Sequence, residues 1–560
     1  MKRDLSRLTS VEYDVLIVGG GIYGLFTAWD AALRGLTVAL VEKRDFGHAT
    51  SFNSLRVIHG GLRYLQHGHV MRMRQSICER TTFMRIAPHV VHPLPFLFPT
   101  YGYGMRGQSI FALALLINDM IGFDRNQLDD PQKHLPAGTC VSTEECLRLA
   151  PGISDEGLTG GAICYDAQLS SSERLIMSIA QSGAYAGVDL CNYVGVTGGM
   201  GEQDELKGVE AKDILTGEKL EIRSKLIINT AGPWVNQVLR QVHQSASSSM
   251  TSFTKAFNVL ISRQLVPQYA IGVYSKKQYT DAKALINKGT RLFIITPWRE
   301  YSLIGTAHLP IQGEPKDRDV TDKEIHDFLS EINDAYPIAA LTPEDIAWTY
   351  WGYLPSPEAN GDAVQLAKDY QICDHEKREG MKGLLSVVGV KLTESRYVAE
   401  KTVDLVLQKL GKRHQKSKTS HTPVFGGDIS HLSSYIKGET QQYLDQKGAA
   451  AVSSLIGRYG SKYQQVLSLL PQDVSSSNVD LHERLLKAEV RYGIQEESAQ
   501  RLSDVIFRRM DWNRPDGFLQ KRLESCAAVM SQEMGWNDKK RDEELMDVQS
   551  TFRAKLMKSC

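Results

Sequence analysis

The chain opens with an apolar segment that runs directly into a cluster of glycines. Residues 13–18 predict a short strand, and the cluster behind it contains Gly19, Gly21 and Gly24. In a dinucleotide-binding unit the first glycine makes the turn from strand to helix, and the second lets the backbone approach a pyrophosphate. The third lets the helix pack closely on the strand. The segment therefore predicts a Rossmann-type α/β unit, with Ile22 and Tyr23 starting a helix whose N-terminus faces the phosphates.

An acidic residue extends this pattern. The predicted helix stops at Gly35, an apolar strand follows over residues 37–41, and Glu42 comes directly after it. A carboxylate at this position accepts hydrogen bonds from ribose hydroxyls and repels a 2′-phosphate, which disfavours NADP. The glycines do not distinguish FAD from NAD, and a glycine-rich turn in another kind of α/β unit is the alternative.

Length and composition limit the remaining classes. A chain of 560 residues predicts two or three domains. Lys plus Arg and Asp plus Glu number 65 each, so no overall field attracts nucleic acid, and no nucleic-acid partner is expected. The eight cysteines lack metal-ligand spacing, so no metal site is expected.

The same reading indicates a cytoplasmic protein. We find no signal peptide, and no apolar run reaches the roughly 20 residues of a membrane-spanning helix. The longest candidate is the segment 110–117, which we expect to pack in the core, with contact to a membrane surface as the alternative.

Two later segments repeat the change from strand to small-residue turn. Residues 225–230 form a predicted strand that ends in Ala231 and Gly232, and residues 384–388 form another that passes through Gly389. Ligands of doubly wound sheets bind outside the carboxyl ends of the strands, so these corners and the first turn would face one cofactor. Three unrelated turns are the alternative.

The pattern along the chain predicts three domains. We assign residues 1–75, 160–250 and 380–410 to a discontinuous dinucleotide-binding domain. Residues 76–159 and 251–379 form an inserted substrate domain with an antiparallel sheet, since residues 292–297 and 301–305 predict paired strands. Residues 411–430 are the predicted linker, and residues 431–560 a helical domain serving dimerisation, capping or stabilisation.

The segment from Thr50 to Leu65, T-S-F-N-S-L-R-V-I-H-G-G-L-R-Y-L, resembles the FAD-dependent glycerol-3-phosphate dehydrogenases and oxidases. Similar segments follow in the same order, so that the resemblance covers nearly the whole chain: I-A-P-H-V-V-H-P-L-P from Ile86, N-T-A-G-P-W-V from Asn229, Y-S-L-I-G-T from Tyr301, W-T-Y-W-G from Trp348, L-L-S-V-V-G-V-K-L-T from Leu384, and residues 487–509.

This resemblance implies an FAD-dependent enzyme that oxidises the secondary alcohol of sn-glycerol 3-phosphate. Hydride passes from C2 to flavin N5 while a base removes the hydroxyl proton. His59 suits the base because its unperturbed pKa lies close to working pH, and Arg63 and Lys391 are donors for the phosphate. A satisfied core histidine and solvated surface charges are the alternatives.

The remaining expected site residues follow from the same resemblance. The expected substrate-binding residues are Arg56, Tyr64, Tyr353, Leu354 and Arg396. The expected cofactor-binding residues are Gly19, Gly21, Ile22, Tyr23, Gly24, Glu42, Lys43, Thr50, Ser51, Ser54, Ala231, Gly232, Gly389, Lys391, Leu392 and Thr393.

Two positions depart from the family pattern. Leu354 stands where the family carries a substrate-binding Arg, and Glu394 stands where its members are neutral. We expect Glu394 to face solvent in a first helical turn, where the helix dipole favours it. Leu354 raises two alternatives: the same chemistry on another hydroxy or amino substrate, and an FAD-binding protein without turnover. The sequence also leaves open whether oxygen or a quinone accepts the electrons. A homodimer is a further possibility that the sequence does not decide.

Overall fold

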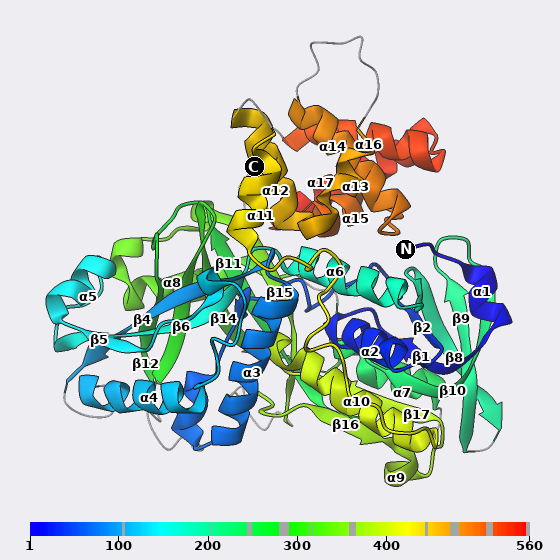
Figure 1. Cartoon of the computed structure of the whole chain (residues 1–560), viewed down its shortest axis with the longest axis horizontal. Helices are drawn as coiled ribbons and strands as arrows, with labels where there is room; N and C mark the ends of the chain where they lie inside the picture. The colour runs from blue at the N-terminus through cyan, green and yellow to red at the C-terminus, as the bar shows by residue number, and fades with distance from the viewer. Residues whose placement is uncertain are drawn as a thin grey trace.

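The computed structural model of the chain contains two sheet-based lobes side by side and a cluster of C-terminal helices above them (Figure 1). It describes residues 1–102, 107–202, 204–243, 249–278, 290–311, 313–316, 319–357, 366–442, 446–470, 481–510 and 519–555.

The first sheet is a parallel Rossmann-type sheet with antiparallel additions. Its central order is β16-β17-β10-β1-β2-β7, and β9 joins β10 while β8 joins β9. The strands are β1 (Glu12–Val18), β2 (Val38–Val41), β7 (Asp189–Cys191), β8 (Val194–Glu202), β9 (Glu205–Asp213), β10 (Lys219–Asn229), β16 (Gln371–Asp374) and β17 (Leu384–Val388). Strands β2, β1, β10 and β17 run parallel, so their carboxyl ends meet at one edge.

Strand β1 is buried on both faces. Val15 and Ile17 belong to one apolar core, and Leu16 and Val18 belong to another on the opposite face. Alternation of side chains across a strand makes this possible, and burial of both faces is typical of a central parallel strand. The helices of this lobe are α1 (Leu5–Ser10), α2 (Ile22–Leu33), α6 (Ser172–Tyr185), α7 (Val235–Val242), α9 (His375–Glu379) and α10 (Ser395–Lys409).

The second sheet is mainly antiparallel. Its order is β15-β11-β14-β13-β12-β4-β6-β3, with β5 beside β6. The strands are β3 (Val57–Ile58), β4 (Val91–Tyr101), β5 (Thr139–Val141), β6 (Leu158–Leu169), β11 (Ser252–Ile261), β12 (Ala270–Gln278), β13 (Thr290–Trp298), β14 (Tyr301–Pro310) and β15 (Ile346–Ser356). Helix α8 (Asp322–Ala335) packs into one apolar core of this lobe and α4 (Gln108–Ile121) into another; α3 (Val70–Ile86) and α5 (Thr143–Leu149) complete the lobe.

The predicted fold class is confirmed, whereas the predicted domain limits differ from the sheets at three places, the first being β3, which lies within residues 1–75 but belongs to the second sheet. Strand β6 begins at Leu158 and belongs to the second sheet, whereas the sequence pattern predicts that residues from 160 onward belong to the dinucleotide-binding domain. Strand β16 belongs to the first sheet, although it was assigned to the substrate domain. Both strands lie next to a crossing between the two sheets, where strand patterns alone do not show the pairing partner.

The expectation that segment 110–117 packs in the core is wrong for much of helix α4. Leu115 is buried, but Leu113 and Leu116 are 54% and 58% exposed, and Met120 is 68% exposed. The helix therefore covers the sheet with one stripe only and presents apolar side chains on its outer face.

The C-terminal part is helical, as predicted. Its elements are α11 (Leu432–Thr440), α12 (Gln446–Tyr459), α13 (Tyr463–Leu467), α14 (Leu481–Gln495), α15 (Leu502–Asp504), a π-helical turn over Val505–Arg509, α16 (Leu519–Met534) and α17 (Asp538–Lys555).

A buried ion network joins these helices to the first lobe. Asp45, just past β2, accepts hydrogen bonds from Arg508 Nε at 2.5 Å and from the Arg509 guanidinium at 2.7 and 2.9 Å. Arg509 also donates to the Glu497 carbonyl, and Arg174 on α6 holds the Glu497 carboxylate at 2.7 and 3.0 Å. All of these charged groups are buried, so each depends on its partners.

Asp45→Asn should destabilise the protein strongly, because it leaves the buried Arg174, Arg508 and Arg509 with two buried carboxylates, Glu497 and Asp504, in place of three. We expect a loss of about 3–5 kcal/mol, measured as a shift of the urea unfolding midpoint. Glu145→Gln is the control, since its pair with Arg148 is exposed to solvent and its loss should leave the midpoint almost unchanged. Equal midpoints for the two variants would contradict a structural role for the network.

Candidate active site

The glycine turn at the end of β1 is closely packed. Gly19 has φ +113°, and a Cβ at this position would lie 2.7 Å from the Thr230 carbonyl oxygen. A Cβ at Gly24 would lie 2.0 Å from the Gly19 oxygen. The Thr230 hydroxyl donates to the Val18 and Gly19 carbonyls at 3.1 and 3.0 Å. Only glycine at these two positions lets β1, α2 and the end of β10 approach so closely.

The N-terminus of α2 fits an anion. Its N-cap is Gly21, which supplies no side-chain acceptor for the first N–H groups of the helix. Ser51 Oγ accepts the Ile22 N–H at 3.0 Å, and a Cβ at Gly21 would lie 3.1 Å from the same oxygen. Free N–H groups and the helix dipole favour negative charge here, as the pyrophosphate of a dinucleotide requires.

Glu42 lies beside this turn. Its carboxylate accepts the Gly20 N–H at 2.7 Å and the Arg44 N–H at 2.8 Å, and burial raises the pKa of Glu42. These contacts fix the carboxylate at the end of β2 and leave lone pairs for ribose hydroxyls. The side chain of Lys43, the next expected cofactor residue, is exposed.

The structure brings the three expected corners together. Ala231 and Gly232 follow β10 beside Thr230, which holds the glycine turn. The Tyr23 hydroxyl donates to the Lys391 carbonyl at 2.6 Å and accepts the Lys391 N–H at 3.1 Å. A Cβ at Gly389 would collide with the Tyr23 ring. These contacts join the ends of β1, β10 and β17 at one edge of the sheet.

The segment 50–65 reaches both lobes. Thr50 Oγ1 donates to the Tyr353 carbonyl at 3.1 Å, and Ser54 Oγ lies 3.2 Å from Ser172 Oγ on α6. The His59 N–H donates to Thr393 Oγ1 at 3.3 Å, next to Leu392 in the 3₁₀ turn Leu392–Glu394. The segment therefore connects the carboxyl edge of the first sheet with the second lobe.

Arg56 and Arg396 do not join the site in the expected way. Arg56 is fully buried and donates to both Glu173 oxygens at 2.8 Å. Arg396 is buried as well and donates to Glu79 and, at 2.9 Å, to Glu400. Both guanidinium groups are paired with carboxylates inside the protein. The expected contacts of Arg56 and Arg396 with the substrate therefore do not fit this geometry.

A compact polar cluster forms where the 3₁₀ helix Leu62–His67 meets the turn Leu392–Glu394. Lys391 Nζ contacts the Tyr64 hydroxyl and lies 4.1 Å from the centre of the Tyr64 ring. The His59 ring meets the same ring edge-on, at 6.0 Å between centroids. His59 Nδ1 is buried and has no hydrogen-bond partner among the described residues. Tyr64 thus links the expected base with the expected phosphate-binding lysine.

Burial changes the titration of this cluster. Desolvation, with a smaller contribution from the Lys391 charge, lowers the pKa of His59 to about 4. The expectation of a pKa close to working pH is therefore corrected: His59 is neutral at pH 7 and a weaker base than a free imidazole. Desolvation also lowers the pKa of Lys391 to about 8, and the Glu394 carboxylate opposes that shift. Lys391 is therefore cationic at neutral pH.

Arg63 and Glu394 differ in exposure. Arg63 is exposed, and in the described part of the chain its side chain makes no hydrogen bond or ion pair. Glu394 is 2% exposed, so the expectation that it faces solvent is wrong. Two other elements cover it through Tyr64 and Arg72, and Lys391 of its own turn lies beside it.

Two residues of the cluster carried no sequence signal. Arg72 on α3 lies over the Tyr64 ring at 4.8 Å and 3.4 Å from Glu394, but it belongs to no motif. Asp166 on β6 accepts the Gly60 N–H at 2.6 Å and Arg80 Nη1 at 2.5 Å, which fixes the turn after His59. Arg72 and Asp166 come from other elements of the fold, so only the tertiary structure shows that they lie beside the cluster.

Strand β15 carries the departure from the family pattern. Leu354 is half-buried and shares a strand face with Gly352, where a Cβ would lie 2.8 Å from Thr50 Oγ1. Tyr353 points to the opposite face and donates its hydroxyl to the Lys316 carbonyl at 2.6 Å. Leu354 therefore lies on the face toward segment 50–65, while the Tyr353 side chain is used elsewhere.

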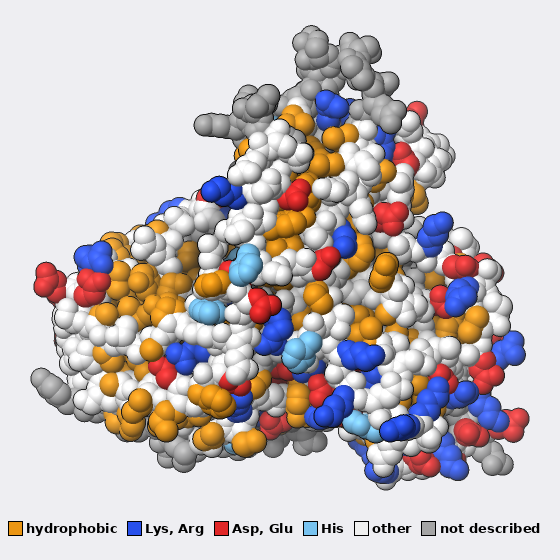
Figure 2. All heavy atoms as spheres, in the orientation of Figure 1, with side chains coloured by type: hydrophobic (Ala, Val, Ile, Leu, Met, Phe, Trp, Pro, Cys, Tyr) orange, Lys and Arg blue, Asp and Glu red, His pale blue; other side chains and the backbone are white. Residues whose placement is uncertain are grey.

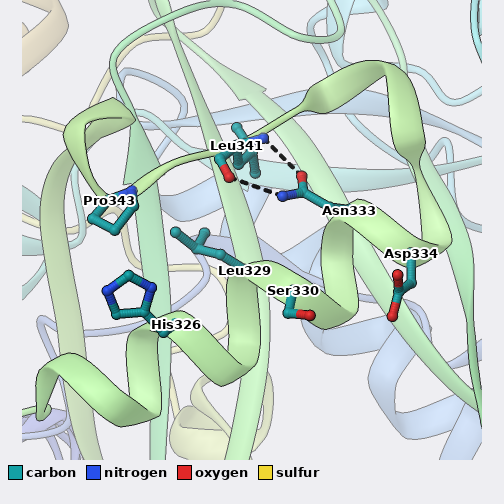
Figure 3. A pocket seen from close by; sticks show the side chains of 7 residues that line it. All are labelled: His326, Leu329, Ser330, Asn333, Asp334, Leu341 and Pro343. Carbon is teal, nitrogen blue, oxygen red and sulfur yellow. Dashed lines mark hydrogen bonds between the residues drawn. The ribbon is translucent and has the colours of Figure 1, made fainter.

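Figure 3 shows a surface hollow on the second lobe. It lies between α8 and the following loop, and its lining residues are His326, Leu329, Ser330, Asn333, Asp334, Leu341 and Pro343. The Asn333 amide is used by the Leu341 backbone, at 2.7 and 2.8 Å. None of the residues around Lys391 lines this hollow.

No helix in the described ranges has both the length and the apolar character needed to cross a membrane.

Known proteins match this architecture over most of the chain. Residues 14–389 match the family of FAD-dependent oxidoreductases, and residues 417–541 match the C-terminal domain of alpha-glycerophosphate oxidase. A glycerol-3-phosphate dehydrogenase of Synechocystis is 31% identical over 517 residues, or 90% of each chain. An aerobic glycerol-3-phosphate dehydrogenase of Staphylococcus haemolyticus is 29% identical over 90% of this chain and 87% of its own.

A solved structure shows the same fold. The glycerol-3-phosphate dehydrogenase from Bacillus halodurans complexed with FAD has a TM-score of 0.76 at 22% identity, covering 99% of this chain and 98% of its own. The glycine turn and the open helix N-terminus fit a dinucleotide, and the family match identifies the cofactor as FAD. The chain belongs to the FAD-dependent glycerol-3-phosphate dehydrogenase and oxidase family and is an FAD-dependent oxidoreductase.

Proposed function

We propose that this enzyme oxidises the secondary alcohol of sn-glycerol 3-phosphate to a ketone, giving dihydroxyacetone phosphate. The observation that carries this proposal is the cluster of His59, Tyr64 and Lys391 beside the glycine turn, at the carboxyl edge of the first sheet. The curated relatives that cover nine-tenths of the chain are named for this activity. FAD, when bound, supplies the hydride acceptor.

The chain's own residues supply the acid–base and binding groups. His59 is neutral at pH 7, so it can accept the hydroxyl proton, and Asp166 fixes the backbone that follows it. Lys391 is held in place by Tyr23 and Tyr64 and is cationic below a pH of about 8. Arg63 is an additional donor without a protein partner among the described residues. A phosphate between Arg63 and Lys391 would place the adjacent carbinol near His59.

Anaerobic addition of glycerol 3-phosphate should reduce the bound flavin. We expect almost the whole absorbance band of the oxidised flavin near 450 nm to disappear, because hydride transfer leaves a reduced flavin. Glycerol without phosphate is the control and should act far more weakly, since Arg63 and Lys391 then have no anion to bind. A flavin that stays oxidised with millimolar substrate sinks the proposal, and a flavin that no reductant reduces favours a protein without turnover.

Leu354 favours a second candidate, the same chemistry on another hydroxy or amino substrate. Leucine offers no hydrogen bond at a position where the family carries an Arg, and one bond to a charged group contributes about 1.5–3 kcal/mol. The native substrate would then be one that needs no hydrogen bond from the side chain at position 354.

Leu354→Arg should lower the KM for glycerol 3-phosphate by about tenfold or more, because one charge-assisted hydrogen bond is added. Steady-state kinetics with a common electron acceptor measure it. Leu354→Met is the matched control, since it changes shape without adding a donor. An unchanged KM in the Arg variant would show that this position does not reach the phosphate.

We also propose that an apolar strip contacts a membrane surface, where a quinone accepts the electrons. We define the strip by exposed side chains at the start of α3 and on or just after α4: Val70, Met71, Leu113, Leu116, Met120 and Phe123. Arg74 lies over the Phe123 ring at 5.1 Å and so ties the two helices together. Figure 2 shows hydrophobic side chains gathered along the lower left edge, where α4 lies in Figure 1. Contiguous exposed apolar surface of this kind marks an interaction site.

Flotation with phosphatidylcholine–phosphatidylglycerol vesicles tests the strip. We expect the wild type to float with the vesicles and the Leu116→Glu/Met120→Glu variant to stay in the aqueous fraction, because the added charges oppose burial among lipids. Leu215→Glu changes another exposed leucine, outside the strip, and should float. A wild type that stays in solution favours oxygen as the acceptor.

A further inference from the structure

Glu394 lies at the centre of the polar cluster. Its side chain is almost completely buried, and one oxygen, Oε1, has three neighbours. It lies 3.4 Å from Arg72 Nε and 3.8 Å from Lys391 Nζ, and it accepts a hydrogen bond from the Tyr64 hydroxyl at 3.5 Å. A single carboxylate oxygen therefore connects side chains from three separate elements of the fold.

The two cations around this oxygen would otherwise repel each other. Lys391 Nζ and the Arg72 guanidinium both lie against the Tyr64 ring, at 4.1 and 4.8 Å from its centre. Cation–π attraction holds each cation against the ring, and repulsion between like charges in a desolvated site opposes it. A carboxylate between the cations compensates that repulsion.

We propose that Glu394 is a positioning residue that assembles Lys391, Arg72 and Tyr64 into a preformed face for the anionic group of the substrate. The proposal deepens the function proposed above and rests on it for the identity of the anion as a phosphate monoester. Glu394 itself acts through Lys391 and Arg72, because a buried carboxylate repels an anion that approaches it.

The charged and titratable groups around Lys391 are few. Glu394 is on its own turn; the others are His59 after β3, Arg63 and Tyr64 on the 3₁₀ helix, Arg72 on α3, Tyr23 on α2, and Asp369. Asp369 is largely exposed, so solvent screens it. Glu394 is the buried anion of the set, and it opposes the desolvation that lowers the pKa of Lys391. Without it, Lys391 would lose its proton at a lower pH.

Glu394→Gln in the FAD-loaded enzyme tests this role, with inorganic phosphate as the probe and the flavin absorbance as the signal. We expect the Kd for phosphate to rise about tenfold, as for the loss of one charge-assisted contact. The alkaline limb of kcat/KM should move down by about one pH unit, because an opposite charge at this distance shifts a pKa by about that much. KM should change more than kcat, since binding is what is lost.

Two further variants complete the design. Glu394→Asp keeps the charge but withdraws it by one methylene, so its phosphate Kd should fall between those of the wild type and the Gln variant. Glu376→Gln removes a carboxylate that pairs with Lys409 at 2.8 Å, away from the cluster, and should leave phosphate binding unchanged. If Glu394→Gln does not retain FAD, the Asp variant carries the test alone.

The outcomes separate the two proposals. The role of Glu394 is overturned if the Gln variant binds phosphate as tightly as the wild type, or more tightly, and the alkaline limb of its kcat/KM profile does not move. If only the Asp variant retains FAD, the role is overturned when its phosphate Kd and its alkaline limb equal those of the wild type. If glycerol 3-phosphate fails to reduce the wild-type flavin but phosphate binding still weakens in the variant, the proposed substrate fails and the positioning role stands.

Discussion

The geometry of this enzyme depends on the buried charges around Asp45. Removing these ions from water is costly, and close contacts among Asp45, Arg508, Arg509, Glu497 and Asp504 offset that cost. The network connects the loop after β2 with the C-terminal helices. It also reaches α6, where Arg174 binds Glu497 and the preceding residue, Glu173, holds Arg56. The two chain segments that border the dinucleotide site, 42–50 and 50–65, are therefore each anchored by buried ion pairs, and the two sets of pairs meet at the neighbouring residues Glu173 and Arg174.

Features that depend on neighbouring residues could be predicted from the sequence. The turn glycines, the helix from Ile22 and the strand Leu384–Val388 all follow from spacing within a few residues, and the structure places them at those positions. The convergence of three strand ends also followed, because parallel strands share their carboxyl edge. Local patterns of this kind need no knowledge of what packs against them.

Features that depend on distant partners could not be predicted. Arg56 and Arg396 are basic residues inside motifs, and only the fold shows that Glu173 and Glu79 occupy them. The sequence alone predicts that Glu394 is an exposed acid at a helix start. Only the fold shows that α3 places Arg72 beside it. The lowered pKa of His59 likewise arises from burial, a property of the assembled site. Helix α4 shows the reverse case, an apolar segment whose outer face the fold leaves uncovered.

The paired hydrogen bonds between Tyr23 and the Lys391 backbone set the order in which the site can be completed during synthesis. These residues lie 368 positions apart, yet each fixes the other. A nascent chain that has reached residue 300 has the glycine turn and β1, but it lacks β17 and the lysine. The dinucleotide half of the site is encoded early, but its contacts with Lys391 form only after the strand Leu384–Val388 has been synthesised and has joined β10.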